Sequence, residues 1–215
     1  MTESTTGLIL RTRPLTETSL IVQWLTPEFG RLATVAKGAR RAKSPFAGKL
    51  DVFYLADLSF SRSRRSELHQ LREVEVREIH GPLREDLGKL RQAAYTTAMI
   101  EQATETGTPL PAVYELLHQF LGVLCRERTR PKLVLAFELK LLCELGLEPN
   151  LTEAPLLAGT KKIAGILARK SWDHAIRLEL TESQLIELRQ FLHDFLISHL
   201  GRLPKGRVSA LENAV

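Results

Sequence analysis

The sequence predicts an α+β protein in which a small barrel of strands precedes a bundle of helices. Apolar and polar residues alternate with a period of two in short runs between residues 8 and 79. After Pro82 the apolar residues recur instead with the 3.6-residue period of amphipathic helices. Because the two periods do not mix, we expect two domains, residues 1–80 and residues 81–215.

Five short runs in the first domain are typical of strands. They are rich in β-branched and aromatic residues and are joined by polar turns. Closing the sheet protects the edges of so many short strands, so we expect a five-stranded barrel. The expected strands are residues 8–14, 19–25, 31–37, 52–62 and 68–79.

Longer runs after Pro82 have helical periodicity. A Thr181-x-x-Gln184 capping box opens the last of them. Residues 131–147 are apolar nearly all round, which indicates a central helix in a bundle. We expect the apolar stripes to form a bundle core and not a cofactor site. The expected helices are residues 82–107, 111–127, 131–147, 161–170 and 181–200.

Basic residues are concentrated in the first domain. From Arg31 to Arg72 there are ten Lys/Arg and three Asp/Glu, whereas residues 81–215 have 17 and 16. The segment VAKGARRAKSPFAGKL, residues 35–50, has five cations and no acid. This concentration indicates a polyanionic partner, because neutralising phosphates releases condensed counterions. A solvated basic surface without a partner is the alternative.

Motifs for other classes of function are missing from the sequence. No run of about 18 apolar residues could span a membrane, and the N-terminus lacks the order of a signal peptide, so we expect a cytoplasmic protein. Walker, G-x-S-x-G and H-E-x-x-H motifs are absent, so we expect no enzyme and no cofactor. Cys125 and Cys143 stand alone in apolar runs, which indicates free thiols and no metal site.

A five-stranded barrel with cationic loops is typical of OB folds, which hold single strands through phosphate contacts and stacked bases. The cations form two groups, and both would line one groove if the two loops reach the same rim. Nothing here indicates recognition of base edges, so binding should be largely independent of sequence. Phe46, Phe29 and Phe60 are candidates for stacking, with barrel core as the alternative. The grouped cations are Lys37, Arg40, Arg41, Lys43, Arg62, Arg64 and Arg65.

Several ordered segments resemble a known family. They are an opening strand with arginine, then TETS, LTPEFGRL and VAKGARRAKS, followed by FELKLLCELGLEPNL and HLGRLPKGRVSAL in the helical half. Together they resemble the RecO family of bacterial recombination mediators. The resemblance covers nearly the whole chain, and VAKGARRAKS is its most specific part. It implies an N-terminal OB fold, a helical domain, binding of single- and double-stranded DNA, and annealing of complementary strands.

The resemblance also implies partners and a cellular role. The partners would be RecR, the single-strand-binding protein and, indirectly, the RecA recombinase, in recombinational repair of DNA damage at the bacterial nucleoid. The chain would help to load recombinase on DNA coated by single-strand-binding protein. With the residues singled out above, the expected DNA contacts are Arg11, Arg31, Lys37, Arg40, Arg41, Lys43, Phe46, Arg62, Arg64, Arg65, Arg202, Lys205 and Arg207.

The helical half departs from the family in one respect and suggests a peptide site in another. Many family members carry a Cys-rich zinc module after the stretch that matches GLEPNL, but NLTEAPLLAGTKKIAGIL follows here without cysteine, so we expect no zinc.

The family suggests capture of the acidic, apolar tail of single-strand-binding protein, for which cations beside an apolar helix are suited. A solvated turn is the alternative. These cations are Arg126, Arg128, Arg130 and Lys132.

Two other functions fit the same sequence features. One is an RNA-binding OB-fold module, since composition does not separate RNA from DNA. The other is an interaction adaptor whose helical bundle is the functional part and whose basic barrel only tethers it. Preference for DNA over RNA, and the effect of reversing the charges at residues 37–43, would separate these from the DNA-binding hypothesis.

Overall fold

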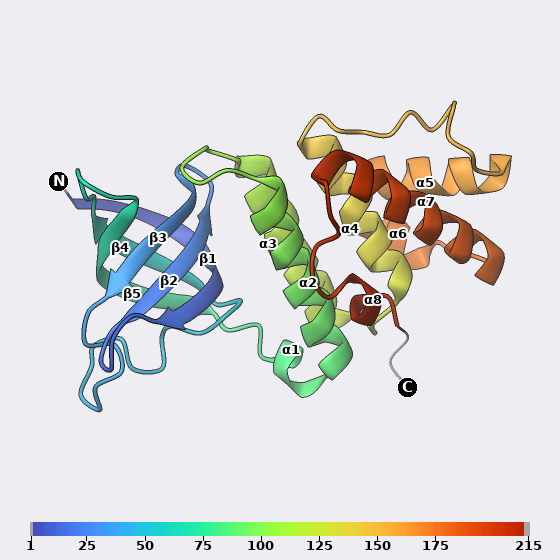
Figure 1. Ribbon diagram of the computed structural model, residues 1–215. Helices are drawn as coiled ribbons and strands as arrows, with labels where there is room; N and C mark the ends of the chain where they lie inside the picture. Colours follow the sequence, from blue (N-terminus) through green and yellow to red (C-terminus); the bar gives the residue numbers. More distant parts are fainter. Residues whose placement is uncertain (1, 213–215) are drawn as a thin grey trace. The chain divides into compact units, whose positions relative to one another are not determined.

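The computed structural model describes residues 2–212, which divide into two compact units (Figure 1). The first unit contains the chain up to His80 together with Thr104–His118. The second contains Gly81–Ala103 and the chain from Gln119 onward. The first unit holds all five strands and the second is helical, which confirms the α+β class.

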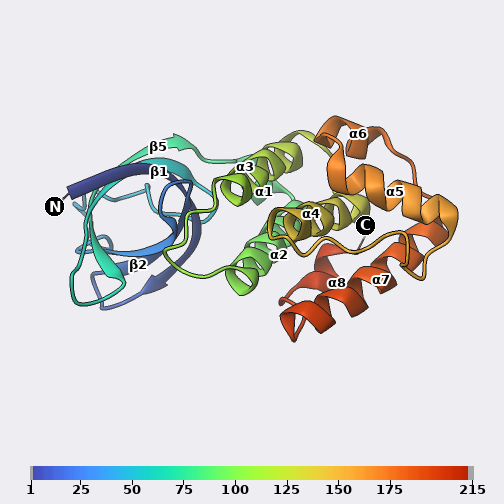
Figure 2. The same ribbon diagram turned by 90° about the horizontal axis from the view of Figure 1, so that it is seen from above.

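The five strands close into a barrel in the order β1-β2-β3-β5-β4, and Figure 2 shows them as a ring. Neighbouring strands are antiparallel except β3 and β5, which are parallel. This is the small five-stranded OB-type barrel that the sequence predicts. The strands are β1 (Thr2–Pro14), β2 (Leu20–Thr26), β3 (Gly30–Ala36), β4 (Leu55–Ser61) and β5 (Leu68–Glu78).

Inward-facing apolar side chains fill the barrel. Val22, Trp24 and Phe60 are fully buried there. Trp24 donates its indole N–H to the hydroxyl of Thr34 at 2.9 Å, which satisfies the buried polar group of the ring. Buried and half-buried residues alternate along the whole of β3, so period-two patterning explains why this segment forms a strand with one face in the core.

Strand pairing defines two ends of the barrel. The β2–β3 turn (residues 27–29) and the β4–β5 turn (residues 62–67) lie at one end, because β3 and β5 run in parallel with Ala33 beside Leu68. We call this the turn end. The β1–β2 turn (residues 15–19) lies at the opposite end with the segment 37–54 that joins β3 to β4 (Figure 1). We call this the loop end.

Helix α4 is the centre of the helical unit, as the sequence predicts. Every residue from Pro131 to Leu139 is buried, and α4 contacts α2, α5, α6 and α7. The helices are α1 (Pro82–Glu85), α2 (Leu87–Ala103), α3 (Pro111–Arg126), α4 (Pro131–Glu144), α5 (Ala158–Arg169), α6 (Trp172–Arg177), α7 (Glu182–Leu200) and α8 (Arg207–Ala210).

A buried ion pair joins α8 to α4. The Arg207 guanidinium donates to both carboxylate oxygens of Glu138, at 2.7 and 2.9 Å. Tyr95 of α2 donates its hydroxyl to the same carboxylate. Burial and the Glu138 charge raise the pKa of Tyr95 well above its ordinary value, so the phenol keeps its proton.

Helix ends agree with the prediction where a capping signal is present and differ elsewhere. The Thr181 capping box is confirmed, with both of its hydrogen bonds formed to Gln184. The single helix expected over residues 82–107 was wrong. The Asp86 carboxylate accepts from the backbone N–H groups of Gly88 and Lys89, at 2.7 and 3.1 Å, and so starts a new helix.

Two short helices, α6 and α8, were not expected from the sequence. Across residues 2–212, no helix combines the length and apolar character needed to cross a membrane.

Candidate nucleic-acid interface

The basic loop, residues 37–43, packs on the β1–β2 turn at the loop end of the barrel. The backbone N–H of Arg40 donates to the carbonyl of Thr18 at 3.0 Å. Its guanidinium donates to the carbonyl of Thr16 at 3.3 Å. The loop therefore has a defined position at this end, while its other cationic side chains extend into solvent.

Three cations of the basic loop are exposed and free to bind an anion. Lys37, Arg41 and Lys43 are exposed. None of them has an acidic partner within the described part of the chain. Arg11 is also exposed, on the half of β1 that leads to the loop end. The structure thus brings Arg11 toward the loop that carries the most specific basic motif.

The other predicted cations of the barrel lie at the turn end. Arg62, Arg64 and Arg65 are exposed in the β4–β5 turn. Arg31 begins β3 and is half-buried, with its guanidinium donating to the carbonyl of Thr104 at 2.6 Å. The sequence leaves open whether both loops reach the same rim, and the strand pairing places them at opposite ends of the barrel. These cations do not form a single continuous groove with the basic loop.

The aromatic candidates differ in their exposure. Phe46 is only 7% exposed and belongs to the barrel core, so its ring has no free face for a stacked base. The exposed basic residues around it concealed this inward position in the sequence. Phe60 is fully buried. Phe29 is half-buried in the β2–β3 turn and retains part of its ring at the surface.

The C-terminal basic motif is divided between surface and interior. Arg202 and Lys205 are exposed. Arg207 is 4% exposed and is paired with Glu138, so its guanidinium cannot reach a phosphate in this structure. Arg207 therefore forms a structural ion pair in place of the DNA contact that the sequence predicts, because its guanidinium is buried.

The expected peptide site is divided in the same way. Arg126, Arg128 and Arg130 are exposed. Lys132 is 5% exposed and donates to the backbone carbonyls of Ile176, at 2.7 Å, and Leu178. Burial lowers the pKa of Lys132 below its ordinary value. Lys132 therefore satisfies the C-terminal carbonyls of α6 and is not available to an acidic tail.

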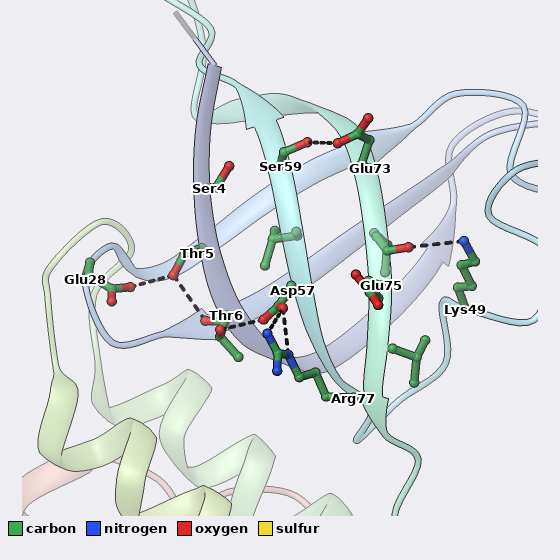
Figure 3. A pocket seen from close by; sticks show the side chains of 13 residues that line it. Ser4, Thr5, Thr6, Glu28, Lys49, Asp57, Ser59, Glu73, Glu75 and Arg77 are labelled. Atoms are coloured by element: carbon green, nitrogen blue, oxygen red, sulfur yellow. Dashed lines mark hydrogen bonds and ion pairs between the residues drawn. The ribbon is translucent and has the colours of Figure 1, made fainter.

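A large groove on the barrel unit is unsuited to a phosphate backbone. This groove, of about 1000 Å³, crosses the outer surface of β1, β4 and β5 (Figure 3). Its two cations are both engaged: Arg77 pairs with Asp57, and Lys49 donates to the carbonyl of Val74 at 3.2 Å. Four carboxylates line the groove and would repel phosphates; they are Glu28, Asp57, Glu73 and Glu75.

The pairing of Asp57 with Arg77 in this groove also changes the pKa of Asp57. The hydrogen bond from Arg77, reinforced by one from Thr6, lowers the pKa of Asp57 below its ordinary value. Asp57 therefore keeps its negative charge at neutral pH. The β1–β4–β5 surface is thus lined by acidic side chains, whereas the basic loop and the cations of the β4–β5 turn lie at the ends of the barrel.

His69 is a half-buried residue that the sequence does not single out as a binding residue. It lies at the start of β5 and stacks on Phe60, with ring centroids 5.5 Å apart. Burial and the charge of Arg62 lower its pKa, so the imidazole is neutral at pH 7. The alternation of Val74 and Val76 with Glu73 and Glu75 shows only that a strand is present. It does not show that β5 begins beside the β2–β3 turn.

Comparison with known proteins supports a family assignment. The sequence model "Recombination protein O N terminal" matches residues 1–80, and "Recombination protein O C terminal" matches residues 84–155. Together they cover more than half of the chain.

Three curated relatives share the name "DNA repair protein RecO". The protein from Alkaliphilus metalliredigens is 35% identical over 69% of this chain and 60% of its own length. That from Anaeromyxobacter dehalogenans is 34% identical over 68% of this chain and 58% of its own. One from Listeria monocytogenes is 27% identical over 94% of this chain and 81% of its own.

The aligned part of the chain thus spans about 60% of the length of the first two relatives. The matches to both terminal models follow the chain in order, from the barrel into the helices. On these grounds, the chain belongs to the RecO family.

Proposed function

We propose that this chain binds DNA and acts as a mediator of recombinational DNA repair. In this role it anneals complementary single strands and helps to load recombinase on DNA coated by single-strand-binding protein. Its partners are single- and double-stranded DNA, RecR, the single-strand-binding protein and, indirectly, RecA. The family membership and the name "DNA repair protein RecO" of the relatives support this role.

One structural observation carries the proposal: the basic loop presents unpaired cations at one end of an OB-type barrel. Lys37, Arg41 and Lys43 have no acid to neutralise them in the described chain, so they repel one another until an anion arrives. A phosphate backbone removes this repulsion and releases counterions into solvent. The acidic groove on β1, β4 and β5 disfavours the same backbone there.

Annealing follows from this arrangement without a catalytic step. Lysine and arginine contacts to phosphates screen the repulsion between two strands and leave their base edges free to pair. Such contacts are indifferent to sequence, as an annealing protein requires. The proposal assigns no cofactor and no hydrolysed nucleotide.

The helical unit is the proposed site for the tail of single-strand-binding protein. Arg126, Arg128 and Arg130 remain as exposed cations that could pair with an acidic peptide. Arg130 is held by Glu179 at 3.2 Å, so a peptide carboxylate must compete with that side chain. Lys132 is left out of this site because it is buried.

Fluorescence anisotropy of a labelled single-stranded oligonucleotide across a salt series tests the proposal. The test variant is Lys37→Glu/Arg40→Glu/Arg41→Glu. The control is Lys162→Glu/Lys170→Glu/Arg177→Glu, which makes the same charge change at exposed positions of the helical unit. About four phosphates on the loop end predict a log–log salt slope near −3 for the parent chain, at roughly −0.7 per phosphate.

We expect the test variant to bind more weakly with a clearly shallower slope, because three of the cations that neutralise phosphates are lost, while the control keeps most of the parent slope. Equal affinity and slope in the test variant and the parent would remove the basic loop from the interface. A parallel series with an RNA oligonucleotide addresses the RNA-binding hypothesis, which tighter binding of RNA would favour.

A further inference from the structure

A small hollow opens at the turn end of the barrel, away from the basic loop. Its volume is about 100 Å³. It is roughly the space of three water molecules, so it admits part of one base but no base pair. Aromatic rings, two arginines and one acid line it: the lining includes Phe29, Phe60, His69, Arg31, Arg62 and Glu67.

Three aromatic rings are in contact at the turn end of the barrel. Phe60 is fully buried. Phe29 meets it edge to face, with centroids 5.5 Å apart and an angle of 87° between the rings. His69 lies nearly parallel to Phe60, at an angle of 12°. Phe29 and His69 are only half-buried, so both contribute ring surface at the opening.

A planar cation already covers Phe29. The guanidinium carbon of Arg62 lies 5.6 Å from the centroid of the Phe29 ring. Arg62 also pairs with Glu3 at 3.4 Å, and its side chain is 53% exposed. An exposed cation–π contact is weak, so a base can replace the guanidinium on the ring. The displaced arginine would then be free to bind the phosphate of that nucleotide.

His69 adds a directed donor to the hollow. Its Nδ1 accepts a hydrogen bond from the backbone N–H of Ser63 at 3.3 Å. In the neutral ring this assigns the proton to Nε2, which can donate to a base oxygen or nitrogen. The β4–β5 turn thus fixes the orientation of the imidazole, so the hollow has a defined polar group as well as apolar walls.

Backbone contacts fix the wall of the hollow that Arg31 and Gly107 form. The N–H of Gly107 donates to the carbonyl of Arg31 at 2.8 Å. A Cβ at Gly30, which has a φ of +59°, would lie 1.8 Å from the carbonyl oxygen of Thr108, so only glycine permits this approach. With the Arg31 guanidinium held on Thr104, the opening is defined before any ligand binds.

We propose that this hollow binds a single unstacked base of a nucleic-acid strand, stacked on Phe29 and hydrogen-bonded by His69. The phosphates beside that base would lie on Arg64 and Arg65, which are exposed in the adjoining turn. This inference rests on the proposed DNA binding and adds to it a second contact region at the opposite end of the barrel from the basic loop. Phosphate contacts alone do not require aromatic rings, so the two regions are separable by experiment.

The test compares three ligands by anisotropy and competition: a thymidine oligonucleotide, the same strand with abasic sites, and inorganic polyphosphate. Phe29→Leu removes the ring but keeps apolar volume, and Phe29→Tyr keeps the ring. The matched control is Phe195→Leu, because Phe195 is also a half-buried ring in contact with another ring, His199, and lies in α7. Circular dichroism and thermal unfolding establish that each variant is folded.

We expect Phe29→Leu to weaken binding of the normal oligonucleotide roughly 5- to 150-fold, the value of one stacked base. Binding of the abasic strand and of polyphosphate should not change, and Phe29→Tyr and Phe195→Leu should bind like the parent. Equal effects of Phe29→Leu on the normal and abasic strands, or no effect on either, would overturn the base site. That result would leave the proposed function intact as long as the parent chain binds the oligonucleotide and the basic-loop variant loses binding; absence of oligonucleotide binding by the parent chain would reject the proposed function itself.

Discussion

Replacing Arg207 by alanine should destabilise the helical unit by about 3–5 kcal/mol, the cost of breaking a buried ion pair. The side chains of Arg207 and Glu138 are 4% and 0% exposed, and two hydrogen bonds of 2.7 and 2.9 Å join them. Without the guanidinium, the carboxylate would remain buried with Tyr95 as its remaining side-chain donor. The loss is a large fraction of the 5–15 kcal/mol typical of a domain.

Urea unfolding followed by circular dichroism measures this loss, with two neighbouring cations as controls. Arg202 and Lys205 belong to the same basic motif but are exposed, so their alanine variants should stay within about 0.5 kcal/mol of the parent. A second variant, Arg207→Met/Glu138→Leu, removes both charges and should recover much of the stability. Recovery would show that the unpaired carboxylate causes the loss.

The oligonucleotide affinity of Arg207→Ala separates a structural role of Arg207 from a DNA contact. If Arg207→Ala unfolds like the two controls but weakens oligonucleotide binding, the ion pair does not stabilise the fold and Arg207 contacts DNA. The structure predicts the reverse pattern: a less stable protein that binds normally at temperatures where it is folded.

Three further changes test other parts of the structure. Lys132→Ala should cost about 1.5–3 kcal/mol, because a charged group loses buried hydrogen bonds, while urea unfolding of Arg128→Ala should match the parent. Phe46→Ala should cost about 3–5 kcal/mol as a core truncation, whereas Phe46→Leu should leave oligonucleotide anisotropy unchanged. The folded-state pKa of Asp57 is lowered from 3.8 by Arg77, so this carboxylate stabilises the fold above about pH 4 and loses the effect as the pH falls further. Thermal unfolding across pH should therefore show a shallower acid decline for Asp57→Asn, and an unchanged decline would refute the pairing.

Local patterns in the sequence predicted much of the barrel and the bundle. The alternation in residues 31–37 becomes β3, and the all-apolar run at 131–147 becomes the buried helix α4. The basic loop is exposed, as its density of charge indicates. Each of these features depends on neighbours close in sequence, so periodicity and charge are sufficient to find it.

Features that depend on distant parts of the chain were not predictable in this way. Whether the Ser-Arg turn meets the basic loop depends on the strand order, in which β5 lies between β3 and β4. Arg207 looks like a surface cation until Glu138, 69 residues earlier, is brought beside it. Phe46 lies in a basic, glycine-containing segment but packs inward on the barrel. In each case tertiary contacts override the local signal.

Lysine acetylation, read by mass spectrometry with and without a saturating single-stranded oligonucleotide, tests the central claim most directly. The chain supplies its own controls, because Lys37 and Lys43 lie in the basic loop whereas Lys162 and Lys170 are exposed in the helical unit. DNA binding at the loop end predicts that the oligonucleotide protects Lys37 and Lys43 and leaves Lys162 and Lys170 reactive. Unchanged reactivity of Lys37 and Lys43 when the oligonucleotide is bound would contradict the account.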